Sequence, residues 1–188
     1  MFKELTPDEL RVDSLYSIYK PKTPFRENRS RIYLDTFING EVQKTSDSSF
    51  QKGLPAFCDC FTSGDSIFIS TGAGFFGGFG IYISIEKTSF ESSFYEYTDD
   101  VKPYKLSLSD TASTNFIHVK NSSQVLLLDK PPTFNSGDIV SGQLSFTSRP
   151  YFEDDNSLEM REVSVRGKII FTCRLRAKTP FELWYFRQ

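Results

Sequence analysis

Residues 66–86, SIFISTGAGFFGGFGIYISIE, are the stretch that most constrains the fold of this chain. Two runs in which apolar and polar residues alternate flank a centre rich in glycine and phenylalanine. Alternation with period two and enrichment in β-branched residues are typical of strands. The isoleucines that share one face are Ile67 and Ile69 in the first run and Ile81, Ile83 and Ile85 in the second. We therefore interpret the stretch as a β-hairpin with its tip among the glycines.

The same stretch contains a string that occurs in dinucleotide-binding folds. Residues 72–77, GAGFFG, match the pattern G-x-G-x-x-G and follow a strand. In those folds the glycines must open a helix whose N-terminus binds the pyrophosphate. Here the chain continues into a second strand pattern, residues 79–85, instead of a helix. The string therefore does not indicate a nucleotide site.

Length and composition favour a single all-β domain. The chain of 188 residues is long enough for one sizeable core. Aromatic residues make up 15% of it, and aromatic and threonine residues favour strands over helices. We predict an antiparallel β-sandwich or flattened barrel of about eight to ten strands, forming one domain over residues 31–188.

The first 30 residues are expected to form a short helix and a basic arm. Thr6, Pro7 and Glu9 have the spacing of a helix start, with a capping hydroxyl, an N-terminal proline and a capping-box glutamate. The helix is expected to end by about residue 15, because two prolines follow it. Residues 20–31 are rich in basic side chains and are expected to be a solvated linker or, alternatively, a contact for an acidic partner or a lipid surface.

Further strands and turns are expected along the rest of the chain. Asn39-Gly40 is the strongest short turn signal, and we predict a hairpin there. The other expected strands are residues 54–62, 104–108, 115–120, 125–128, 139–148, 163–165 and 168–176. Residues 121–123 are interpreted as a tight turn and Gly142 as a bulge.

Charge and hydropathy argue against two kinds of partner. The net charge is −2 and the pI about 5.5, so there is no global basic field that would bind nucleic acid by counterion release. No apolar run approaches the roughly 18 residues of a transmembrane helix, and the N-terminus has no apolar signal core. We expect no nucleic-acid partner, and contact with a membrane only through a lipid anchor that this sequence does not contain.

The three cysteines do not predict a disulfide framework. Cys58 and Cys60 would share one face of a strand about 7 Å apart, which is too far for a direct bridge without a bend. Cys173 alternates with apolar residues and is expected to be a small core residue. A bridge from Cys173 to either Cys58 or Cys60 can form across strands, so the cysteines leave the redox compartment open.

Aromatic side chains provide the candidate ligand-binding residues. Phe75 and Phe76 stand at the hairpin tip among glycines, each of which costs about 0.5–1 kcal/mol in an ordered strand relative to alanine. We expect at least one of these rings to be exposed and to contact a partner; alternatively, both cap one end of the domain. Phe94, Tyr95 and Tyr97 stand beside carboxylates, as in a groove that stacks on sugar rings, or alternatively pack on the sheet.

Candidates for catalysis and metal binding are few. His118, the only histidine, is expected to face solvent from a strand, because no nucleophile motif accompanies it. Glu91 and Glu96 are a candidate carboxylate pair for glycoside hydrolysis. A weak candidate calcium site is an acidic segment that can equally be an exposed loop tip. This segment contains Glu153, Asp154, Asp155 and Glu159. No cofactor is expected.

The order of several short motifs resembles a known family. The motifs are FINGEV at 37–42, GIYISI at 80–85, GDIVSGQLSFTS at 137–148 and VSVRGKIIF at 163–171. Together with a tyrosine-rich loop after the second motif, they resemble the small secreted β-sandwich lipoprotein domains of unknown function of the Bacteroidetes type. The resemblance implies a lipid-anchored domain of the cell envelope and supplies no catalytic residues.

Two functions are compatible with these observations. We expect a noncatalytic binding or structural module of the cell envelope, whose exposed aromatic residues contact glycan or protein. The alternative is a carboxylate-dependent glycan hydrolase that acts through residues 91–100. The module is expected in the periplasm or on the outer surface if a signal segment has been removed, and in the cytoplasm otherwise, because no lipobox cysteine precedes Met1.

Overall fold

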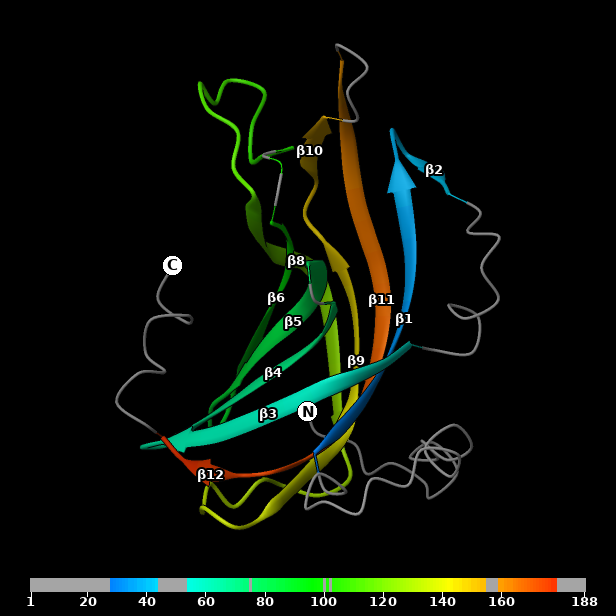
Figure 1. Cartoon of the computed structure of the whole chain (residues 1–188). Helices are drawn as coiled ribbons and strands as arrows, with labels where there is room; N and C mark the ends of the chain where they lie inside the picture. The colour runs from blue at the N-terminus through cyan, green and yellow to red at the C-terminus, as the bar shows by residue number, and fades with distance from the viewer. Residues whose placement is uncertain are drawn as a thin grey trace.

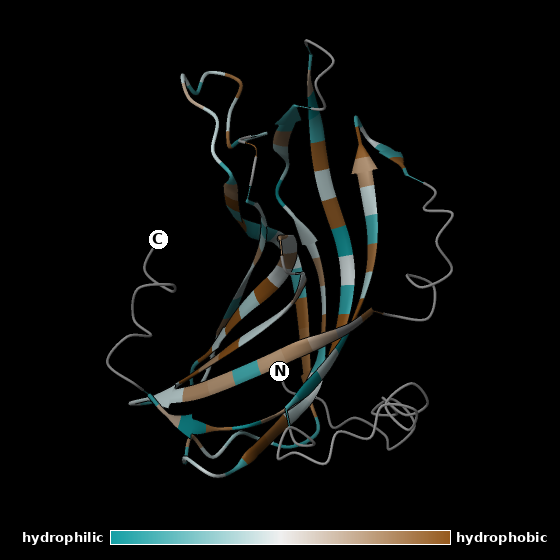
Figure 2. Cartoon of the chain, viewed as in Figure 1, coloured by the Kyte–Doolittle hydropathy of each residue, from teal (hydrophilic) through white to brown (hydrophobic). Residues whose placement is uncertain are grey.

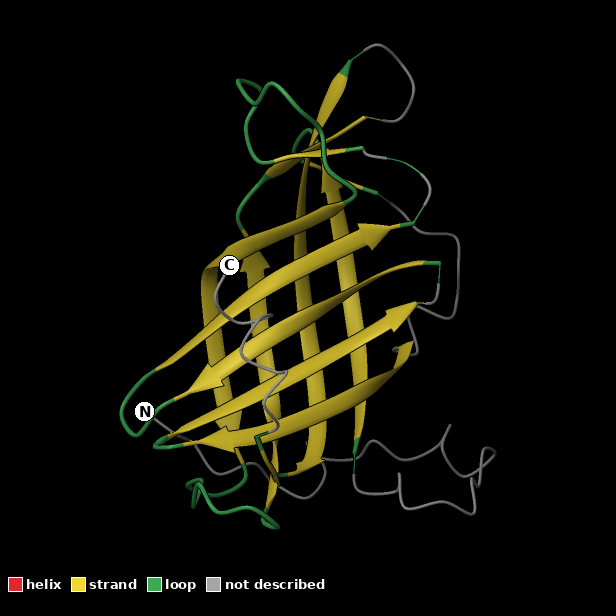
Figure 3. Ribbon diagram, turned by 60° about the vertical axis from the view of Figure 1, so that its left-hand side comes forward, coloured by secondary structure: helices red, strands yellow, loops and turns green. Residues whose placement is uncertain are grey.

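The computed structural model describes residues 28–43, 54–74, 76–99, 101, 103–154 and 159–178. Every regular element within these ranges is a strand (Figure 3). The all-β class predicted from the alternation is therefore confirmed. The helix predicted near residue 7, most of the predicted arm and residues 179–188 lie outside the described part of the chain.

Eight antiparallel strands form a closed barrel (Figure 1). In chain order they are β1 (Arg29–Ile38), β3 (Leu54–Ser63), β4 (Ser66–Gly74), β5 (Gly77–Ile85), β6 (Phe90–Thr98), β8 (Phe116–Leu128), β9 (Ile139–Ser148) and β11 (Met160–Arg174). Each strand pairs with the next one, and β11 pairs with β1 from Arg29↔Thr172 to Ile38↔Val163. The sheet thus closes on itself. Of the two predicted architectures, the structure has the barrel, because β1 pairs on both of its sides.

Four short strands extend the barrel. They are β2 (Glu41–Val42), β7 (Tyr104–Lys105), β10 (Tyr151–Asp154) and β12 (Arg176–Ala177). The predicted turn joins β1 to β2, and Asn39 and Gly40 have φ values of 50° and 83°, as a two-residue hairpin turn requires. β10 pairs with both β11 and β7, and β12 runs parallel to β3.

Connections at both ends of the barrel vary in length, because the short β4–β5 turn lies at the upper end and the longer β8–β9 connection at the lower end. At the lower end, which is at the bottom of Figure 1, short turns at residues 64–65 and 86–89 join β3 to β4 and β5 to β6. At the upper end, longer connections lead from β1 to β3 and from β6 to β8. β10 lies at this upper end (Figure 1), and β7 pairs with it.

The isoleucine pattern of the sequence fills the lower half of the barrel. Ile67, Ile69, Ile81, Ile83 and Ile85 are at most 1% exposed, and the register places Ile69 opposite Ile83. The two strands therefore present one continuous apolar face to the interior. Figure 2 shows the same alternation of hydropathy along β11. Burying each such side chain contributes about 1.5–3 kcal/mol, so this cluster is a main source of stability.

Several predictions about single elements are wrong. The segment predicted as a loop after residue 86 contains β6, which pairs along its length with β5 and β8. The predicted turn at residues 121–123 lies inside β8, as a register shift between Asn121 and Ser123. β11 is continuous where two strands were expected, β7 is shorter than the strand expected at 104–108, and Gly142 causes no register shift. Pairing on both sides outweighs weak local propensity in these strands.

The glycines of the hairpin let a tyrosine lie against the outer wall. Gly72 of β4 faces Gly80 of β5, and Gly80 faces Tyr95 of β6. A Cβ atom on either glycine would lie within 2.5 Å of the Tyr95 hydroxyl oxygen, closer than any real Cβ contact. The Tyr95 ring stacks on Tyr82 with a centroid separation of 4.6 Å. The glycines thus permit a close approach, as the sequence suggested, but the approaching group belongs to the same chain.

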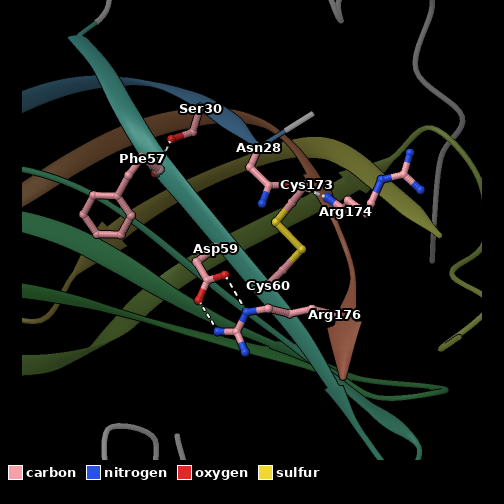
Figure 4. The surroundings of a disulfide bond; sticks show 8 residues. All are labelled: Asn28, Ser30, Phe57, Asp59, Cys60, Cys173, Arg174 and Arg176. Atoms are coloured by element: carbon pink, nitrogen blue, oxygen red, sulfur yellow. Dashed lines mark hydrogen bonds and ion pairs between the residues drawn. A yellow bond between two sulfur atoms is a disulfide. The ribbon is translucent and has the colours of Figure 1, made fainter. Parts of the chain in front are cut away.

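A disulfide joins Cys60 of β3 to Cys173 of β11 in the lower part of the barrel (Figure 4). Both cysteines are fully buried, and both of their strands flank β1. Of the two bridges that the sequence left open, the structure therefore contains the one with Cys60. Cys58 is buried and free, and burial, together with the charge of Asp59, raises the pKa of its thiol.

An ion pair on the outer wall holds β12 against β3. Arg176 and Asp59 point toward each other, and the Arg176 Nε donates to Asp59 Oδ1 at 3.0 Å (Figure 4). The Arg176 guanidinium also lies 5.4 Å from the centroid of the Phe61 ring, where a cation is attracted by the ring face. The strand that follows the disulfide is thereby fixed to the barrel.

Candidate ligand site inside the barrel

A cavity that is partly open to solvent lies toward the upper end of the barrel. It has a volume of about 210 Å³, and β1, β5, β6, β10 and β11 contribute to its wall. The apolar lining residues are Leu34, Phe79, Phe94, Val163 and Val165, and the polar ones are Thr36, Glu96, Tyr151 and Glu153. An apolar wall with a few converging polar groups is the usual composition of a small-molecule site.

Glu96 enters the cavity because of its place in β6. Successive residues of a strand face opposite sides of the sheet. Phe94 and Glu96 line the cavity, whereas Tyr95 lies on the outer wall. The register places Glu96 opposite Phe79 of β5. A carboxylate therefore occupies an inward position that elsewhere in the barrel is mostly apolar.

Two tyrosines bind the Glu96 carboxylate. The Tyr151 hydroxyl donates to Glu96 Oε2 at 2.6 Å, and the Tyr104 hydroxyl forms a second hydrogen bond to the same carboxylate. Tyr104 comes from β7 and Tyr151 from β10, so the two short strands supply both tyrosines. Among the described residues, no lysine or arginine forms an ion pair with Glu96.

The surroundings of Glu96 disfavour its charged form. Burial is the largest cause and raises the pKa of the carboxyl group above the ordinary glutamate value. The hydrogen bond from Tyr151 opposes this effect, the nearby charge of Glu153 adds to it, and Tyr104 opposes it again. The net result is a raised pKa, which means that the fold holds this carboxylate at a cost.

Packing fixes the two tyrosine donors. Tyr104 is 2% exposed and Tyr151 1% exposed, and their rings meet edge to face with centroids 6.1 Å apart. Phe94 stacks on Tyr151 at 6.2 Å. Burial and the neighbouring carboxylates raise the pKa of both phenols, so both hydroxyls keep their protons and remain donors.

Glu153 lies in the same cavity with a different partner. Its Oε2 is 3.2 Å from Nη2 of Arg161, which is opposite it in the β10–β11 register. Both side chains are 28% exposed, so this side of the cavity reaches solvent. The two carboxylates therefore differ, because Glu153 has a cation and Glu96 has hydroxyl donors.

The structure places the predicted aromatic residues on different faces, with Tyr95 and Tyr97 together on the outer wall beside Phe116. Phe76 is 85% exposed at the hairpin tip, as expected for at least one of the two tip rings, and Phe75 lies outside the described residues. Phe94 is buried inside the barrel, and Tyr95 is buried on the outer wall. Tyr97 is partly buried and pairs with Phe116. Their contact with a ligand stays a prediction, and only Phe94 lines the cavity.

The acidic segment proposed as a weak metal site is divided between two faces. Glu153 lines the cavity, Asp154 and Glu159 are exposed, and Asp155 lies outside the described residues. Across the described part of the chain, no group of three or more His, Cys, Asp or Glu residues is arranged to hold a metal ion.

The carboxylate pair proposed for hydrolysis does not share one surface. Glu91 is exposed and lies 3.4 Å from Nζ of Lys120, whereas Glu96 lines the cavity. His118 lies on the outward face, but its ring is partly buried against Tyr82, and its Nε2 lies 2.5 Å from Oγ of Ser93. Glu91 and Glu96 therefore cannot act together on one bond.

Sequence reasoning recognised Glu96 as a candidate but missed its setting. The signal was present in FESSFYEYT, because Phe90, Ser92, Phe94 and Glu96 follow each other at every second position. In a strand, this alternation places the Glu96 carboxylate on the same inward face as Phe90 and Phe94. Tyr104 and Tyr151 had no comparable signal, because their role depends on the pairing of β7 with β10.

A second depression lies on the outer wall over β1, β8, β9 and β11 and has a volume of about 600 Å³. Its charged groups include Asp35 and Arg166, which pair with each other at 3.0 Å and are each more than half exposed. These groups are solvated and already matched. The interior cavity is therefore the stronger candidate site.

The fold and this site define a class of protein: a closed antiparallel barrel of eight strands with a largely apolar cavity that contains two carboxylates at one end. Comparison with protein-family models, with curated proteins and with solved structures finds no match for the chain. The resemblance to secreted lipoprotein domains therefore stays a prediction. In the described part of the chain, no helix has the length and apolar character needed to span a membrane.

Proposed function

We propose that this protein is a noncatalytic binding module that holds one small ligand in the upper end of its barrel. The observation that carries this proposal is the cavity of about 210 Å³ with Glu96 and Glu153 in an otherwise largely apolar wall. Eight-stranded barrels have interiors that are either filled by side chains or hold one small ligand. In this barrel one core cluster packs the interior, and a cavity of about 210 Å³ remains beside it at the upper end.

The size of the cavity limits the ligand. Sites for drug-sized molecules usually have about 300–1,000 Å³, so this cavity suits a smaller compound. The carboxylates accept hydrogen bonds, and the ligand is therefore expected to offer donors at one end. Phe79 and Phe94 would contact its apolar part.

We place the module in the cell envelope, in agreement with the motif resemblance. The buried Cys60–Cys173 bridge supports this placement, because disulfides persist mainly in oxidising compartments. The exposed Phe76 ring supports a further contact with glycan or protein at the upper end.

The alternative function is carboxylate-dependent hydrolysis of a glycan. With Glu91 on the outer face, the remaining pair is Glu96 and Glu153. Glu153 is already paired with Arg161, and Glu96 accepts hydrogen bonds from two tyrosines, which favours binding over turnover. Turnover of a glycan that is lost in Glu96→Gln would support the hydrolase instead.

The binding module is tested by filling its cavity. A panel of compact molecules that includes monosaccharides, amines and carboxylic acids is screened by thermal shift with the whole protein. We expect at least one compound to raise Tm in the wild type and not in Leu34→Trp, which places an indole in the cavity. Tyr33→Trp, on the neighbouring outward position of β1, is the matched control and should keep the response. A response that survives in Leu34→Trp, or no response to any compound, would contradict the proposal.

A further inference from the structure

Among the described residues that line the cavity, Glu96 is a carboxylate that no cation contacts. The cavity contains the carboxylates of Glu96 and Glu153, and the guanidinium of Arg161 contacts Glu153. Within the described residues Glu96 contacts hydroxyl groups and no cation. An ionised buried carboxylate is stabilised far more by a cation than by neutral donors. The described residues therefore provide no positive charge next to Glu96.

Aromatic rings surround the same carboxylate. Phe79 is opposite Glu96 in the β5–β6 register, and Phe94 precedes it on the inner face of β6. Tyr104 and Tyr151 contact it through their hydroxyls. Aromatic faces attract ammonium groups, and this attraction increases where water is excluded. Rings and a carboxylate together favour a cation that also has an apolar part.

We propose that the ligand of this cavity is a small organic cation, with its ammonium group on Glu96 and its apolar part against Phe79, Phe94 and Val165. This inference rests on the proposed binding function and specifies its ligand class. The polar end of the ligand lies beside Glu96 and Tyr151. The apolar end is enclosed by inward residues of β5, β6 and β11.

The other titratable groups near Glu96 do not supply a positive charge to it. Tyr104 from β7 and Tyr151 from β10 stay neutral, and Glu153 from β10 adds a negative charge that disfavours the ionised form of Glu96. Arg161 from β11 is engaged by Glu153. β1 contributes Leu34 and Thr36, and β5 contributes Phe79, none of which titrates. A cation that binds ionised Glu96 should therefore release a proton wherever the free carboxyl group is still protonated.

A charge series of equal size tests the inference. Butylammonium, 1-butanol and butyrate are titrated into the whole protein by calorimetry, and potassium chloride serves as a cation without an apolar part. We expect butylammonium to bind at least tenfold more tightly than 1-butanol, with no measurable binding of butyrate or potassium. Glu96→Gln should lose this preference, and Glu91→Gln, on the outward face of the same strand, should keep it. Circular dichroism confirms that both variants are folded.

The outcomes separate this inference from the function on which it rests. Equal binding of butylammonium and 1-butanol, or a preference for butyrate, would overturn the cation while leaving a small-molecule site. A preference for butylammonium that persists in Glu96→Gln would also overturn it. Proton release on binding, measured in two buffers of different ionisation enthalpy, should occur in the wild type and be absent in Glu96→Gln. Both proposals fail if none of these probes binds and if no compound of the panel gives a thermal shift that Leu34→Trp abolishes.

Discussion

At the scale of single residues, Glu96 is a position at which the fold gives up stability. Because burial raises the pKa of this carboxyl group, the folded state keeps its proton to a higher pH than the unfolded state does. The contribution of Glu96 to stability is then complete below the ordinary glutamate pKa of about 4.3 and is lost as pH rises through the higher folded value.

Replacing Glu96 should therefore stabilise the protein at neutral pH. In Glu96→Gln the side-chain carbonyl can still accept from Tyr151, and the buried charge is removed. We expect a higher Tm than the wild type at pH 7 and a difference that shrinks toward pH 4, measured by thermal denaturation across this range. Glu91→Gln, which is exposed, should change stability by no more than about 0.5 kcal/mol at either pH. A lower Tm of Glu96→Gln at pH 7 would show that the carboxylate is purely structural.

At the scale of elements, the hairpin of β4 and β5 is matched to β6 by the contact of Gly72 with Tyr95. The nearest atom to a Cβ on Gly72 is the Tyr95 hydroxyl oxygen at 2.5 Å, and this atom can be removed by mutation. We expect Gly72→Ala to destabilise the fold by about 1–3 kcal/mol, as overpacking usually does. The loss should be smaller in a Tyr95→Phe background, as measured by urea denaturation in a double-mutant cycle. Equal losses of stability in both backgrounds would show that a group other than the Tyr95 hydroxyl causes the strain.

The elements also show what could be predicted from the sequence. β4, β5 and β9 were predicted closely, because their alternation is strong and their turns are rich in glycine. β6 was missed because serine, glutamate and tyrosine dilute its alternation, and β8 was divided because Asn121-Ser122-Ser123 resembles a turn. Barrel and sandwich share the same period of two, so only the pairing of β1 with β11 distinguishes them. The cavity depends on five strands that are far apart in the sequence, and no local pattern describes it.

At the scale of the whole molecule, the Cys60–Cys173 bridge ties the first part of the barrel to its last strand across a separation of 113 residues. A bridge that closes a long loop restricts the unfolded chain strongly, and removing a native disulfide typically costs 2–5 kcal/mol. We expect Cys60→Ala/Cys173→Ala to lose roughly this much in guanidinium denaturation. Reduction of the wild type should have the same effect, and Cys58→Ala should keep its sensitivity to reductant. A double variant as stable as the oxidised wild type would show that the bridge adds nothing.

The closing contact between β1 and β11 also determines when this protein can fold. Residue 29 pairs with residue 172, so the first barrel strand has to wait for almost the entire chain before it finds its second partner. Contacts between residues so distant in sequence make folding slow, and until β11 arrives both β1 and β9 present open edges that can pair with other chains. A chain that emerges from the ribosome without β11 is thus a candidate for aggregation, and the last barrel strand to be synthesised is the one that protects all the others.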